Sequence, residues 1–459
     1  MYLKDVFKTK KNISFKKIVL NSKDIQKGDL FIPFGGIVDR NTFILDALDK
    51  KCSCIITDKK FPHEKIFYTK NLETEIIAIF NKYYNYPLKD IKLIGITGTD
   101  GKTTMASILS NLLNCPNIGT NGFLIENKVY PLSNTTPPLD ILYNCFDMTR
   151  NKQFKNVVME VSSEAYLTKR IGALPFDVAI FTNITKEHLD KHKTFANYLN
   201  CKLQLIKNSK IAILNKDSKY YYYFKDNANC SYSYGFKKGS DLRILYYKLY
   251  FDKTFICFKY KNKKYKLVYP LLGKFNVYNT SAAILTMLTL GFSMEEIFLR
   301  FKNLKQVPGR MEIIKNKNYF TVLDYAHTTN ATYNVLKFFK KFNKNIITVV
   351  GCAGERYKEK RKEIGNLVLK YSKFVIFTSD DPRYEDPLDI IAEMIGKSKK
   401  TNYISILDRK KALGIAFLIY ESNDILLILG KGRDNYMLIK DKKIKYSDYD
   451  EIVTLLKED

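Results

Sequence analysis

The sequence lacks any apolar segment long enough to cross a bilayer. Its longest uninterrupted apolar stretches, such as Ile425 to Leu429, have the length of a strand, whereas a membrane helix needs about 20 apolar residues. The start, from Met1 to Phe15, carries lysines but not the apolar stretch that follows them in a signal peptide. We therefore expect a soluble, cytoplasmic protein without membrane insertion.

Grouped metal ligands are also scarce. The eight cysteines are scattered, and only Cys52 and Cys54 lie close together, inside a strand-like apolar run. No second pair of cysteines or histidines completes a zinc set, which favours buried free thiols, and reduced thiols fit a cytosolic protein. The four histidines are His63, His188, His192 and His327.

Acidic residues are few relative to basic ones, 47 against 76, which gives a formal net charge of +29. A basic balance of this size raises nucleic-acid binding as one interpretation. The lysines, however, are spread over the whole chain among many Asn, Ile and Tyr residues, and no basic block stands apart as a tail. We interpret the charge as a compositional bias and expect no nucleic-acid partner. A basic surface would also favour a polyanionic substrate.

Hydrophobic residues are plentiful, at 46% of 459 residues, which favours packed cores and predicts two to four domains. Residues 1–88 have the pattern of a small α/β unit. From Lys92 onward, continuous apolar strands alternate with helical patterns, which is typical of a parallel sheet buried on both faces. Residues 230–270 alternate Tyr, Lys, Phe and Ile, and predict antiparallel hairpins attached to this sheet.

The last third of the chain has its own alternation of strands and helices, from Phe320–Leu323 to Ile425–Leu429. That rhythm is typical of a doubly wound sheet. We predict an α/β fold of three domains: residues 1–88, residues 89–305 with a parallel sheet of the P-loop ATPase type and attached hairpins, and a Rossmann-like domain at 306–459.

The sharpest motif runs from Gly95 to Thr104, between a predicted strand and a helical pattern over Met105–Leu113. Glycines let the backbone approach phosphates, Lys102 can neutralise β/γ oxygens, and the Thr103 hydroxyl can bind Mg²⁺. The full Walker spacing would require glycine at Ile96, so the shorter G-x-x-G-K-T form remains. The loop predicts ATP binding but not the reaction, because motors, kinases, switches and ligases all use it.

A second group of polar residues follows neighbouring strands. Glu160 lies near the carboxyl end of Val157–Val161, where a carboxylate beside a phosphate-loop strand is well placed for Mg²⁺. The next strand ends at Thr182 and runs on to His188. An isolated histidine is more often structural than catalytic, but this position at a strand end of the same sheet favours a functional His188.

Ordered motifs along nearly the whole chain resemble those of the Mur ligases, and most of all the MurE type, which adds the third residue of the peptidoglycan stem peptide. These motifs are Gly-Thr-Asp-Gly-Lys-Thr-Thr (98–104), Asn-Thr-Thr-Pro (134–137), Met-Glu-Val-Ser-Ser (159–163), Thr-Asn-Ile-Thr-Lys-Glu-His-Leu-Asp (182–190), Tyr-Leu-Asn-Cys-Lys (198–202), Gly-Lys-Phe-Asn-Val-Tyr-Asn (273–279), Pro-Gly-Arg-Met-Glu (308–312), Asp-Tyr-Ala-His-Thr (324–328), Gly-Cys-Ala-Gly-Glu-Arg (351–356), Asp-Asp-Pro-Arg (380–383) and Gly-Lys-Gly (430–432). Near the start, Asn21-Ser22-Lys23 and Gly28-Asp29-Leu30-Phe31 resemble the uridine-binding domain of MurE.

The resemblance implies an ADP-forming acid–amino-acid ligase of peptidoglycan precursor synthesis. ATP would phosphorylate the terminal carboxylate of UDP-MurNAc-L-Ala-D-Glu, and a diamino acid would then attack the acyl phosphate. Two Mg²⁺ ions and a lysine suit the task of bringing polyanions together. Residues 1–88 would bind the UDP part, and the last domain would close over the central one before chemistry. We expect a monomer.

The resemblance also implies a role for each matching residue. The ATP-binding residues would be Gly98, Thr99, Asp100, Gly101, Lys102, Thr103, Thr104, Asn276, Asn279 and Asp324. The catalytic residues would be Lys102, Lys202, Glu160, His188 and Arg310. The metal ligands would be Thr103, Glu160, His188 and Lys202, the last as a carbamylated lysine. The sugar-peptide substrate would contact Ser22, Thr135, Thr136, Ser162, Ser163 and Arg170. The incoming amino acid would contact Arg356, Asp380, Asp381, Arg383, Gly430 and Asp434.

Three departures from the MurE pattern concern the substrates. Asp381 replaces the usual asparagine and suits an ammonium, whereas Arg383 suits a carboxylate through paired N–H donors. Arg433-Asp434 replaces the usual His-Glu, and Glu164 replaces a histidine. Arg383 favours meso-diaminopimelate, with L-lysine next. The alternatives are a Mur-family paralogue with another acceptor or amine, a nucleic-acid-binding P-loop ATPase and a non-catalytic homologue.

Overall fold

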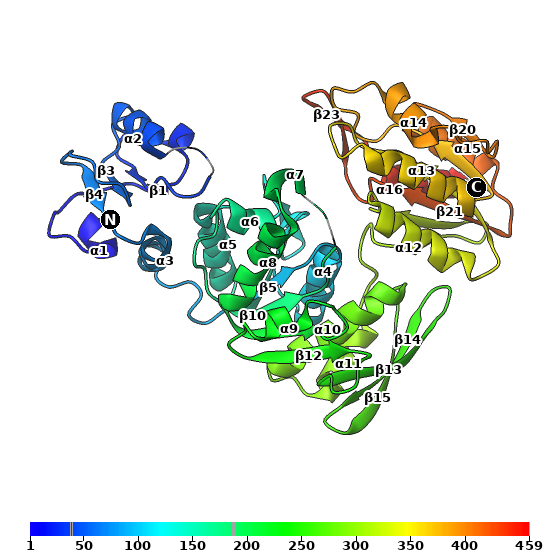
Figure 1. Cartoon of the computed structure of the whole chain (residues 1–459), viewed down its shortest axis with the longest axis horizontal. Coiled ribbons are helices and arrows are strands. Elements are labelled where there is room, and N and C mark those ends of the chain that lie inside the picture. The colour runs from blue at the N-terminus through cyan, green and yellow to red at the C-terminus, as the bar shows by residue number, and fades with distance from the viewer. Residues whose placement is uncertain (37, 39, 186, 188, 459) are drawn as a thin grey trace. The chain divides into compact units, whose positions relative to one another are not determined.

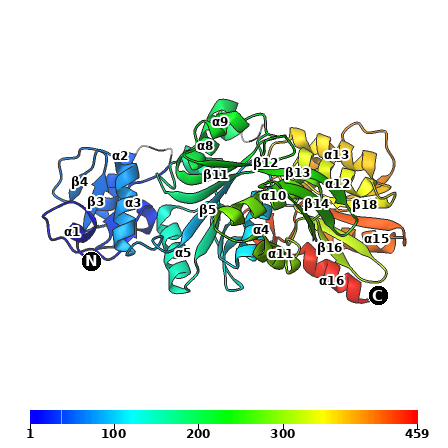
Figure 2. The same ribbon diagram turned by 90° about the horizontal axis from the view of Figure 1, so that it is seen from below.

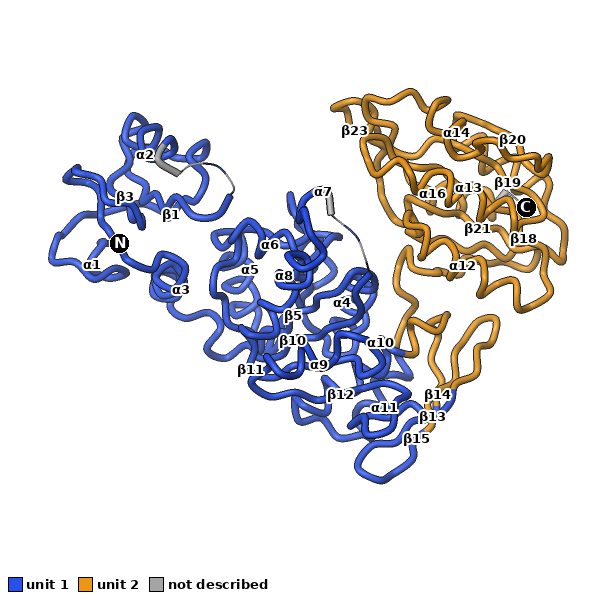
Figure 3. The backbone as a smooth tube through the Cα atoms, viewed as in Figure 1, with its two compact units in different colours: residues 1–246, 257–265, 278–303 blue, residues 247–256, 266–277, 304–459 orange. Residues whose placement is uncertain are grey.

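The computed structural model describes residues 1–36, 38, 40–185, 187 and 189–458 (Figure 1). Contacts divide the chain into two units (Figure 3). Unit 1 comprises residues 1–246, 257–265 and 278–303, and unit 2 comprises residues 247–256, 266–277 and 304–459. Each unit therefore combines segments from separate parts of the sequence. No helix of the described residues combines the length and the apolar character needed to span a membrane.

The first part of unit 1 is a four-stranded parallel sheet in the order β1-β2-β3-β4. Its strands are β1 (Ile18–Val19), β2 (Leu30–Phe31), β3 (Cys54–Thr57) and β4 (Ile66–Tyr68), and its helical segments are α1 (Leu3–Val6), η1 (Ser22–Asp24), α2 (Arg40–Asp49) and α3 (Leu72–Tyr83). Cys52 and Cys54 are buried free thiols, as predicted. Burial raises the pKa of Cys52 to about 11 and that of Cys54 to about 12, so both stay protonated at neutral pH.

The second part of unit 1 is built on an eleven-stranded sheet in the order β15-β14-β13-β12-β11-β10-β5-β9-β6-β7-β8, whose end beyond β12 includes residues of unit 2. Its strands are β5 (Lys92–Thr97), β6 (Asn117–Gly119), β7 (Gly122–Ile125), β8 (Lys128–Tyr130), β9 (Asn156–Glu160), β10 (Phe176–Phe181), β11 (Ser209–Asn215), β12 (Ser231–Gly235), β13 (Leu242–Leu249), β14 (Thr254–Tyr260) and β15 (Lys263–Tyr269). The helices are α4 (Lys102–Leu113), α5 (Leu139–Asn151), α6 (Ser163–Leu167), α7 (Leu189–His192), α8 (Phe195–Lys207), α9 (Tyr221–Lys225), α10 (Lys274–Thr289) and α11 (Met294–Lys302).

The strand order reverses at β5. Both of its neighbours, β9 and β10, run parallel to it. Strands β6 to β9 all lie on one side of β5, and from β9 the chain crosses to β10 and continues toward the other edge. In open parallel sheets, ligands bind outside the carboxyl ends of the strands at such a reversal. The topology therefore predicts a ligand site at the loop that follows β5.

Residues 230–270 differ in part from the predicted antiparallel hairpins. β12 pairs in parallel with β11, so the main sheet extends one strand further than predicted. The alternation of side-chain types in β12 resembles that of a hairpin strand. Tyr234 of β12 is nevertheless buried, and its hydroxyl donates to the carbonyl of Phe181 at 3.1 Å. β13, β14 and β15 are neighbours joined by residues 250–253 and 261–262, which are too few for a parallel crossover, so hairpins do occur there.

Unit 2 contains a six-stranded sheet in the order β16-β17-β21-β18-β19-β20, in which only β16 is antiparallel to its neighbour. The strands are β16 (Glu312–Lys315), β17 (Phe320–Asp324), β18 (Asn345–Val350), β19 (Phe374–Phe377), β20 (Tyr403–Ser405) and β21 (Asp424–Leu429), with a separate hairpin of β22 (Tyr436–Ile439) and β23 (Lys442–Lys445). The helices are α12 (Thr329–Lys340), α13 (Glu359–Tyr371), α14 (Pro387–Ile395), α15 (Arg409–Leu418) and α16 (Asp448–Glu458).

Helices cover both faces of this six-stranded sheet (Figure 2). Ile346 and Val350 of β18 pack in the core formed with α12, α13 and α14, while Ile347 and Val349 pack with α15 and α16. Because successive strand residues point to opposite faces, a strand buried on both faces is apolar throughout. The predicted doubly wound arrangement of the last third is confirmed.

The burial pattern of unit 2 gives a stability prediction. Leu427 in β21 is fully buried, and Leu427→Ala should lower the free energy of unfolding by roughly 2–5 kcal/mol because it leaves a cavity. Leu388 in α14 is 55% exposed, and Leu388→Ala should change that free energy by less than about 0.5 kcal/mol. Urea unfolding followed by circular dichroism measures both, and equal effects would contradict the burial pattern.

Candidate functional site

The phosphate loop, residues 98–101, connects β5 to α4. Gly101 adopts a left-handed conformation, with φ of 84°, directly before α4. A Cβ atom on Gly98 would collide with the hydroxyl of Thr182, so the backbone approaches that residue closely. The ammonium of Lys102 donates to the carbonyls of Gly98 and Thr99 at 3.0 and 2.9 Å. A cation and the N-terminus of α4 are thus brought to one short loop, which favours phosphate.

The loop that follows β10 holds the phosphate loop in shape. The amides of Thr99 and Asp100 donate to the main-chain carbonyl and the side-chain oxygen of Asn183, at 2.9 and 3.0 Å. The Thr182 hydroxyl donates to the carbonyl of Asp100 at 2.8 Å. The conformation of residues 98–101 is therefore fixed by the protein itself, which lowers the ordering cost of binding.

Glu160, the last residue of β9, is buried beside the start of α4. Its carboxylate accepts from the Thr103 hydroxyl at 2.9 Å and from the Thr120 amide at 3.0 Å. The structure thus brings together two expected metal ligands, Thr103 and Glu160. Thr120 was missed by the sequence analysis, although it follows the short strand β6 directly and β6 is the neighbour of β9.

Lys202 lies on α8 and is 2% exposed. Its ammonium donates to the carbonyl of Gly98 at 2.7 Å and lies 4.5 Å from the centre of the Tyr198 ring. Burial, together with the positive charge of Lys102, lowers the pKa of Lys202 well below its usual range. The site therefore favours a neutral amine at this position.

His188 lies outside the described residues. The described residues contain no group of three or more His, Cys, Asp or Glu side chains that could hold a metal ion. Another histidine of the same motif region, His192, is 1% exposed and its Nε2 lies 2.9 Å from the Ser163 hydroxyl. Ser163 was expected to bind the substrate, and its contact with His192 was not predicted from the sequence.

Four of the residues expected to bind the sugar-peptide substrate lie together. The hydroxyl of Thr136 donates to the carbonyl of Glu160 at 2.9 Å and accepts from the amide of Ser162 at 2.9 Å. Arg170 donates to the carbonyl of Thr136 at 2.9 Å, and the Thr135 hydroxyl lies 3.1 Å from that of Thr120. Ser22 lies instead at the start of η1, which follows β1 of the four-stranded sheet, and its carbonyl accepts from Lys50 at 2.7 Å. Glu164, one of the departures, is ion-paired with Lys191 at 2.9 Å.

The expected adenine and ribose residues are divided between the units. In unit 1, Asn279 of α10 lies next to Gly101 of the phosphate loop, since a Cβ built on that glycine would be 3.4 Å from its side-chain oxygen. In unit 2, Asn276 is buried and donates to the carbonyl of Leu272 at 2.8 Å. Asp324 ends β17 and accepts from the amides of Met311 and Ala326. Burial raises the pKa of Asp324 although Arg310 opposes the shift.

Arg310 lies over the Tyr325 ring, 4.5 Å from its centre. Its Nε is buried and has no hydrogen-bond partner among the described residues. A buried donor without a partner is costly unless a ligand completes its bonding. Arg310 is thus suited to an anionic ligand.

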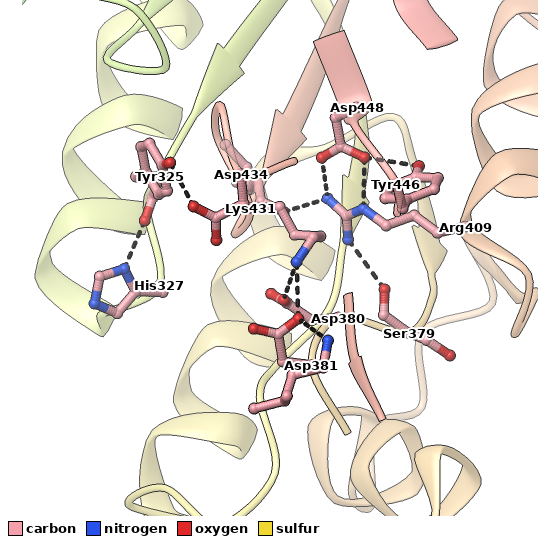
Figure 4. A network of polar contacts seen from close by, with 12 residues as sticks. Tyr325, His327, Ser379, Asp380, Asp381, Arg409, Lys431, Asp434, Tyr446 and Asp448 are labelled. Carbon is pink, nitrogen blue, oxygen red and sulfur yellow. Dashed lines mark hydrogen bonds and ion pairs between the residues drawn. The ribbon is translucent and has the colours of Figure 1, made fainter. Parts of the chain in front are cut away.

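Three of the residues expected to bind the incoming amino acid, Asp380, Asp381 and Asp434, lie around Lys431 (Figure 4). The ammonium of Lys431 lies 2.8 Å from Asp381 and 3.7 Å from Asp380, and its side chain is fully buried. The same oxygen of Asp381 also accepts from the amide of Leu438 at 3.0 Å. Asp381 was expected to suit an ammonium. In the structure it contacts the ammonium of Lys431 from the same chain.

The Arg433-Asp434 departure contacts three further residues of unit 2, Tyr325, Glu312 and Tyr449. Asp434 accepts from the Tyr325 hydroxyl at 2.6 Å, and burial raises the pKa of Asp434 although this bond opposes the shift. Arg433 donates to both oxygens of Glu312, one of them at 2.8 Å, and covers the ring of Tyr449. The new cation is therefore paired within the protein.

Arg383 has a left-handed backbone, with φ of 55°, and its amide and carbonyl bond to Leu438 and Lys440 at 3.1 and 2.8 Å. It lines a cavity of about 810 Å³ that Leu407 and Met437 also line. Its Nε is buried without a hydrogen-bond partner among the described residues, which suits a ligand carboxylate.

Two other expected residues lie on neighbouring loops. Gly430 passes so close to the carboxylate of Asp380 that a Cβ there would lie 2.6 Å from its oxygen. Arg356 is exposed on the loop after β18. That loop is held by the buried guanidinium of Arg361, which donates to the carbonyl of Ala353 at 3.3 Å and to both oxygens of Glu385 at 2.8 and 2.9 Å.

Known proteins with similar sequences show the family of this chain. The family model described as Mur ligase middle domain matches residues 96–287, and the one described as Mur ligase, glutamate ligase domain matches residues 309–432. Curated relatives match over nearly the full chain at identities above 30%. The chain belongs to the Mur ligase family, and the expectation drawn from its motifs is confirmed.

Several of the similar proteins are ligases named for 2,6-diaminopimelate. A UDP-N-acetylmuramoyl-L-alanyl-D-glutamate–2,6-diaminopimelate ligase of Fusobacterium nucleatum is 36% identical, with 97% of this chain and 94% of the relative covered. The ligase of the same name from Clostridium tetani is 33% identical, with 97% and 96% covered. A solved structure with this name has 26% identity and a TM-score of 0.72, covering 97% of this chain and 95% of that one. The Thermotoga maritima MurF ligase complexed with ADP shares the fold, at a TM-score of 0.63 and 20% identity over 96% of this chain and 97% of that one.

The pair of Glu385 and Arg361 gives a prediction of pH dependence. Hydrogen bonds from Arg361 lower the pKa of Glu385 to about 2, below its ordinary 4.5. The carboxylate therefore stabilises the fold fully above pH 4.5, and this contribution is lost as the pH falls toward 2. Glu385→Gln should lower the free energy of unfolding at pH 7, and the difference from wild type should shrink steadily below pH 4.5. Urea unfolding at several pH values measures it, and a constant difference would contradict the assignment.

Proposed function

We propose that this chain joins a diamino acid to UDP-MurNAc-L-Ala-D-Glu at the expense of ATP, with meso-diaminopimelate as the first choice of amine. The observation that carries the proposal is the arrangement of Lys102, Thr103 and Glu160 at the strand reversal. It is supported by full-length similarity to ligases named for 2,6-diaminopimelate. In this proposal residues 1–88 bind the UDP substrate, residues 89–305 bind ATP and residues 306–459 bind the amino acid.

The triphosphate would be held by residues 98–104 of the loop and by Lys102. The hydroxyl of Thr103 and the carboxylate of Glu160, which are hydrogen-bonded to each other, are hard oxygen donors that suit Mg²⁺. Thr103 would hold a first Mg²⁺, and Glu160 and His188 would hold a second that Lys202 helps to position. When bound, Mg²⁺ supplies positive charge that offsets the phosphate oxygens. Asn276, Asn279 and Asp324 would hold the adenosine part.

Lys202 would serve as a carbamate. Its neutral amine, favoured by burial, can add CO₂ and release a proton, which converts an ammonium into an anion. Such an anion would relieve the repulsion between Lys202 and Lys102. The depressed pKa of Lys202 supports this modification.

The reaction would run in two displacements. A terminal carboxylate oxygen of the substrate attacks the γ-phosphorus, ADP leaves, and an acyl phosphate forms. The amine then attacks the acyl carbon, inorganic phosphate leaves, and the ammonium formed loses a proton to give the amide. Arg310, with its buried Nε donor, would offset charge on the transferring phosphoryl group. The substrate would be oriented by Ser22, Thr135, Thr136, Ser162, Ser163 and Arg170.

The choice of amine rests on the charges of unit 2. Arg383 offers a buried donor to a carboxylate, which meso-diaminopimelate carries at its far end and L-lysine lacks. Lys431 already neutralises Asp381, so this carboxylate adds no net charge for a second ammonium. L-lysine is the second candidate because Asp380 and Asp434 place two further carboxylates near Lys431, which suit the side-chain ammonium of that substrate. Arg356 and Gly430 would complete the amino-acid site.

The proposal also covers the cellular compartment and the oligomeric state of the enzyme. A nucleotide-linked, water-soluble substrate and reduced cysteines fit an enzyme that works in the cytoplasm. We also propose that the chain acts as a monomer, because it carries matches to every substrate-binding part of the family.

The ATP assignment predicts the effect of Lys102→Ala. Loss of the ammonium should lower ligation by about 10²–10³-fold or more, because transition-state charge on the phosphates is no longer offset. The assay supplies ATP, Mg²⁺, UDP-MurNAc-L-Ala-D-Glu and a panel of amino acids, and follows ADP release and product mass. Lys128→Ala, an exposed lysine of β8, is the matched control and should be fully active. A fully active Lys102→Ala would remove the assignment.

The amine assignment predicts the effect of Arg383→Ala. Loss of a charge-assisted bond to the far carboxylate should lower kcat/KM for meso-diaminopimelate by about 10–100-fold. The value for L-lysine should change far less, since that substrate has no carboxylate there. Parallel steady-state assays with the two amines test this, and an equal loss for both would overturn the specificity assignment.

A further inference from the structure

Arg409 is the first residue of α15, and its side chain is fully buried. Its guanidinium donates to both oxygens of Asp448, from Nε at 2.8 Å and from Nη2 at 2.7 Å. It also donates to the carbonyl of Leu429 at 2.9 Å and to that of Ser379 at 3.2 Å (Figure 4). All three nitrogens of the guanidinium are thus engaged.

The two carbonyls belong to the segments that carry the amino-acid site. Ser379 directly precedes Asp380 and Asp381, and Leu429 directly precedes Gly430 and Lys431. The segments follow β19 and β21, which are not neighbours, since β18 lies between them in the sheet. No backbone ladder therefore joins these two strands directly, and Arg409 connects them through one rigid group.

The two carbonyls that Arg409 binds are next in sequence to the polar groups of the site. Lys431 reaches from one segment to Asp381 of the other at 2.8 Å, and Gly430 closely approaches Asp380. A change in the spacing of the two segments by a few tenths of an ångström would alter these contacts. Arg409 also lines the cavity that Arg383 lines, but its three guanidinium nitrogens bond Asp448 and the two carbonyls, so its effect on the site comes through the spacing of the two segments.

Asp448 gives this guanidinium a fixed partner. It is fully buried at the start of α16 and also accepts from the Tyr446 hydroxyl at 2.8 Å. Buried ion pairs contribute little net stability compared with apolar groups of equal volume, but their bonds have fixed directions. The buried Arg409–Asp448 pair is therefore better explained by the fixed positions that it gives to its hydrogen-bond partners than by a gain in the stability of the fold.

We propose that Arg409, held by Asp448, is a positioning residue that sets the spacing of the Asp380–Asp381 and Gly430–Lys431 segments and thereby the affinity for the incoming amino acid. This inference rests on the proposed function, in which those segments bind that amino acid.

The chain offers a matched control at the other end of the same two strands. Lys373 directly precedes β19, and its ammonium lies 3.4 Å from Asp424 at the start of β21 and 2.7 Å from Glu421. Lys373→Met removes a cation that joins β19 to β21 far from their carboxyl ends. It should alter stability without altering the site.

The experiment measures KM for the amino acid and KM for ATP in full-length wild type, Arg409→Lys, Tyr446→Phe and Lys373→Met. Lysine keeps the charge of Arg409 but cannot reach Asp448 and both carbonyls in one planar group. Arg409→Lys should raise KM for the amino acid about 10–100-fold and KM for ATP less than about twofold. Tyr446→Phe, a milder change, should raise the amino-acid KM by a few-fold, and Lys373→Met should change neither value.

An unchanged amino-acid KM in folded Arg409→Lys, or equal increases in both KM values, would overturn the proposal. If Arg409→Lys does not fold, Tyr446→Phe decides, and an unchanged amino-acid KM there counts against the proposal in the same way. A wild-type chain that ligates none of the diamino acids would instead overturn the proposed function. The two failures are therefore distinguishable.

Discussion

Two lysine ammonium groups converge on one carbonyl oxygen, that of Gly98, at 3.0 Å from Lys102 and 2.7 Å from Lys202. Two positive charges so close together repel each other, and burial adds to the cost for Lys202. A triphosphate, a carbamate or a neutral amine relieves this repulsion. The arrangement is possible because Gly98 has no side chain and fits against Thr182, so the shape of the phosphate loop determines the electrostatics around it.

In unit 2 the structural requirement is different, because its loops hold charged side chains at fixed distances from one another. The loops that follow its parallel strands are held by ion pairs, Arg361 with Glu385, Arg409 with Asp448 and Lys431 with Asp381. Each cation also bonds a main-chain carbonyl or a second carboxylate. Apolar packing could fill the same space, but it lacks the directionality that fixes a loop to a few tenths of an ångström.

The sequence predicted the regular elements well, because their signals are local. The strand Lys92–Thr97 is apolar between its two end residues, Ile425–Leu429 is apolar throughout, and the phosphate loop is marked by its glycines. Ser231–Gly235 was assigned to a hairpin because its alternation gives no sign of the parallel neighbour it meets. Of the expected site residues, Thr103 and Glu160 come together in the structure, whereas His188 lies outside the described residues. The partners of Glu160, Asp381 and Ser163, which are Thr120, Lys431 and His192, were missed because each contact joins residues distant in sequence.

The interleaving of the two units has a consequence for dissecting the chain. The core of unit 2 includes Leu272 and is flanked by Phe251, whose ring lies 4.0 Å from that of Phe320, centre to centre. Both belong to segments that precede Leu304 by tens of residues. A fragment beginning at Leu304 would therefore leave apolar surface on β17 and α12 without its cover and would be prone to aggregate. The compact unit 2 is therefore not a contiguous stretch of sequence, and a truncation at Leu304 cuts through its core.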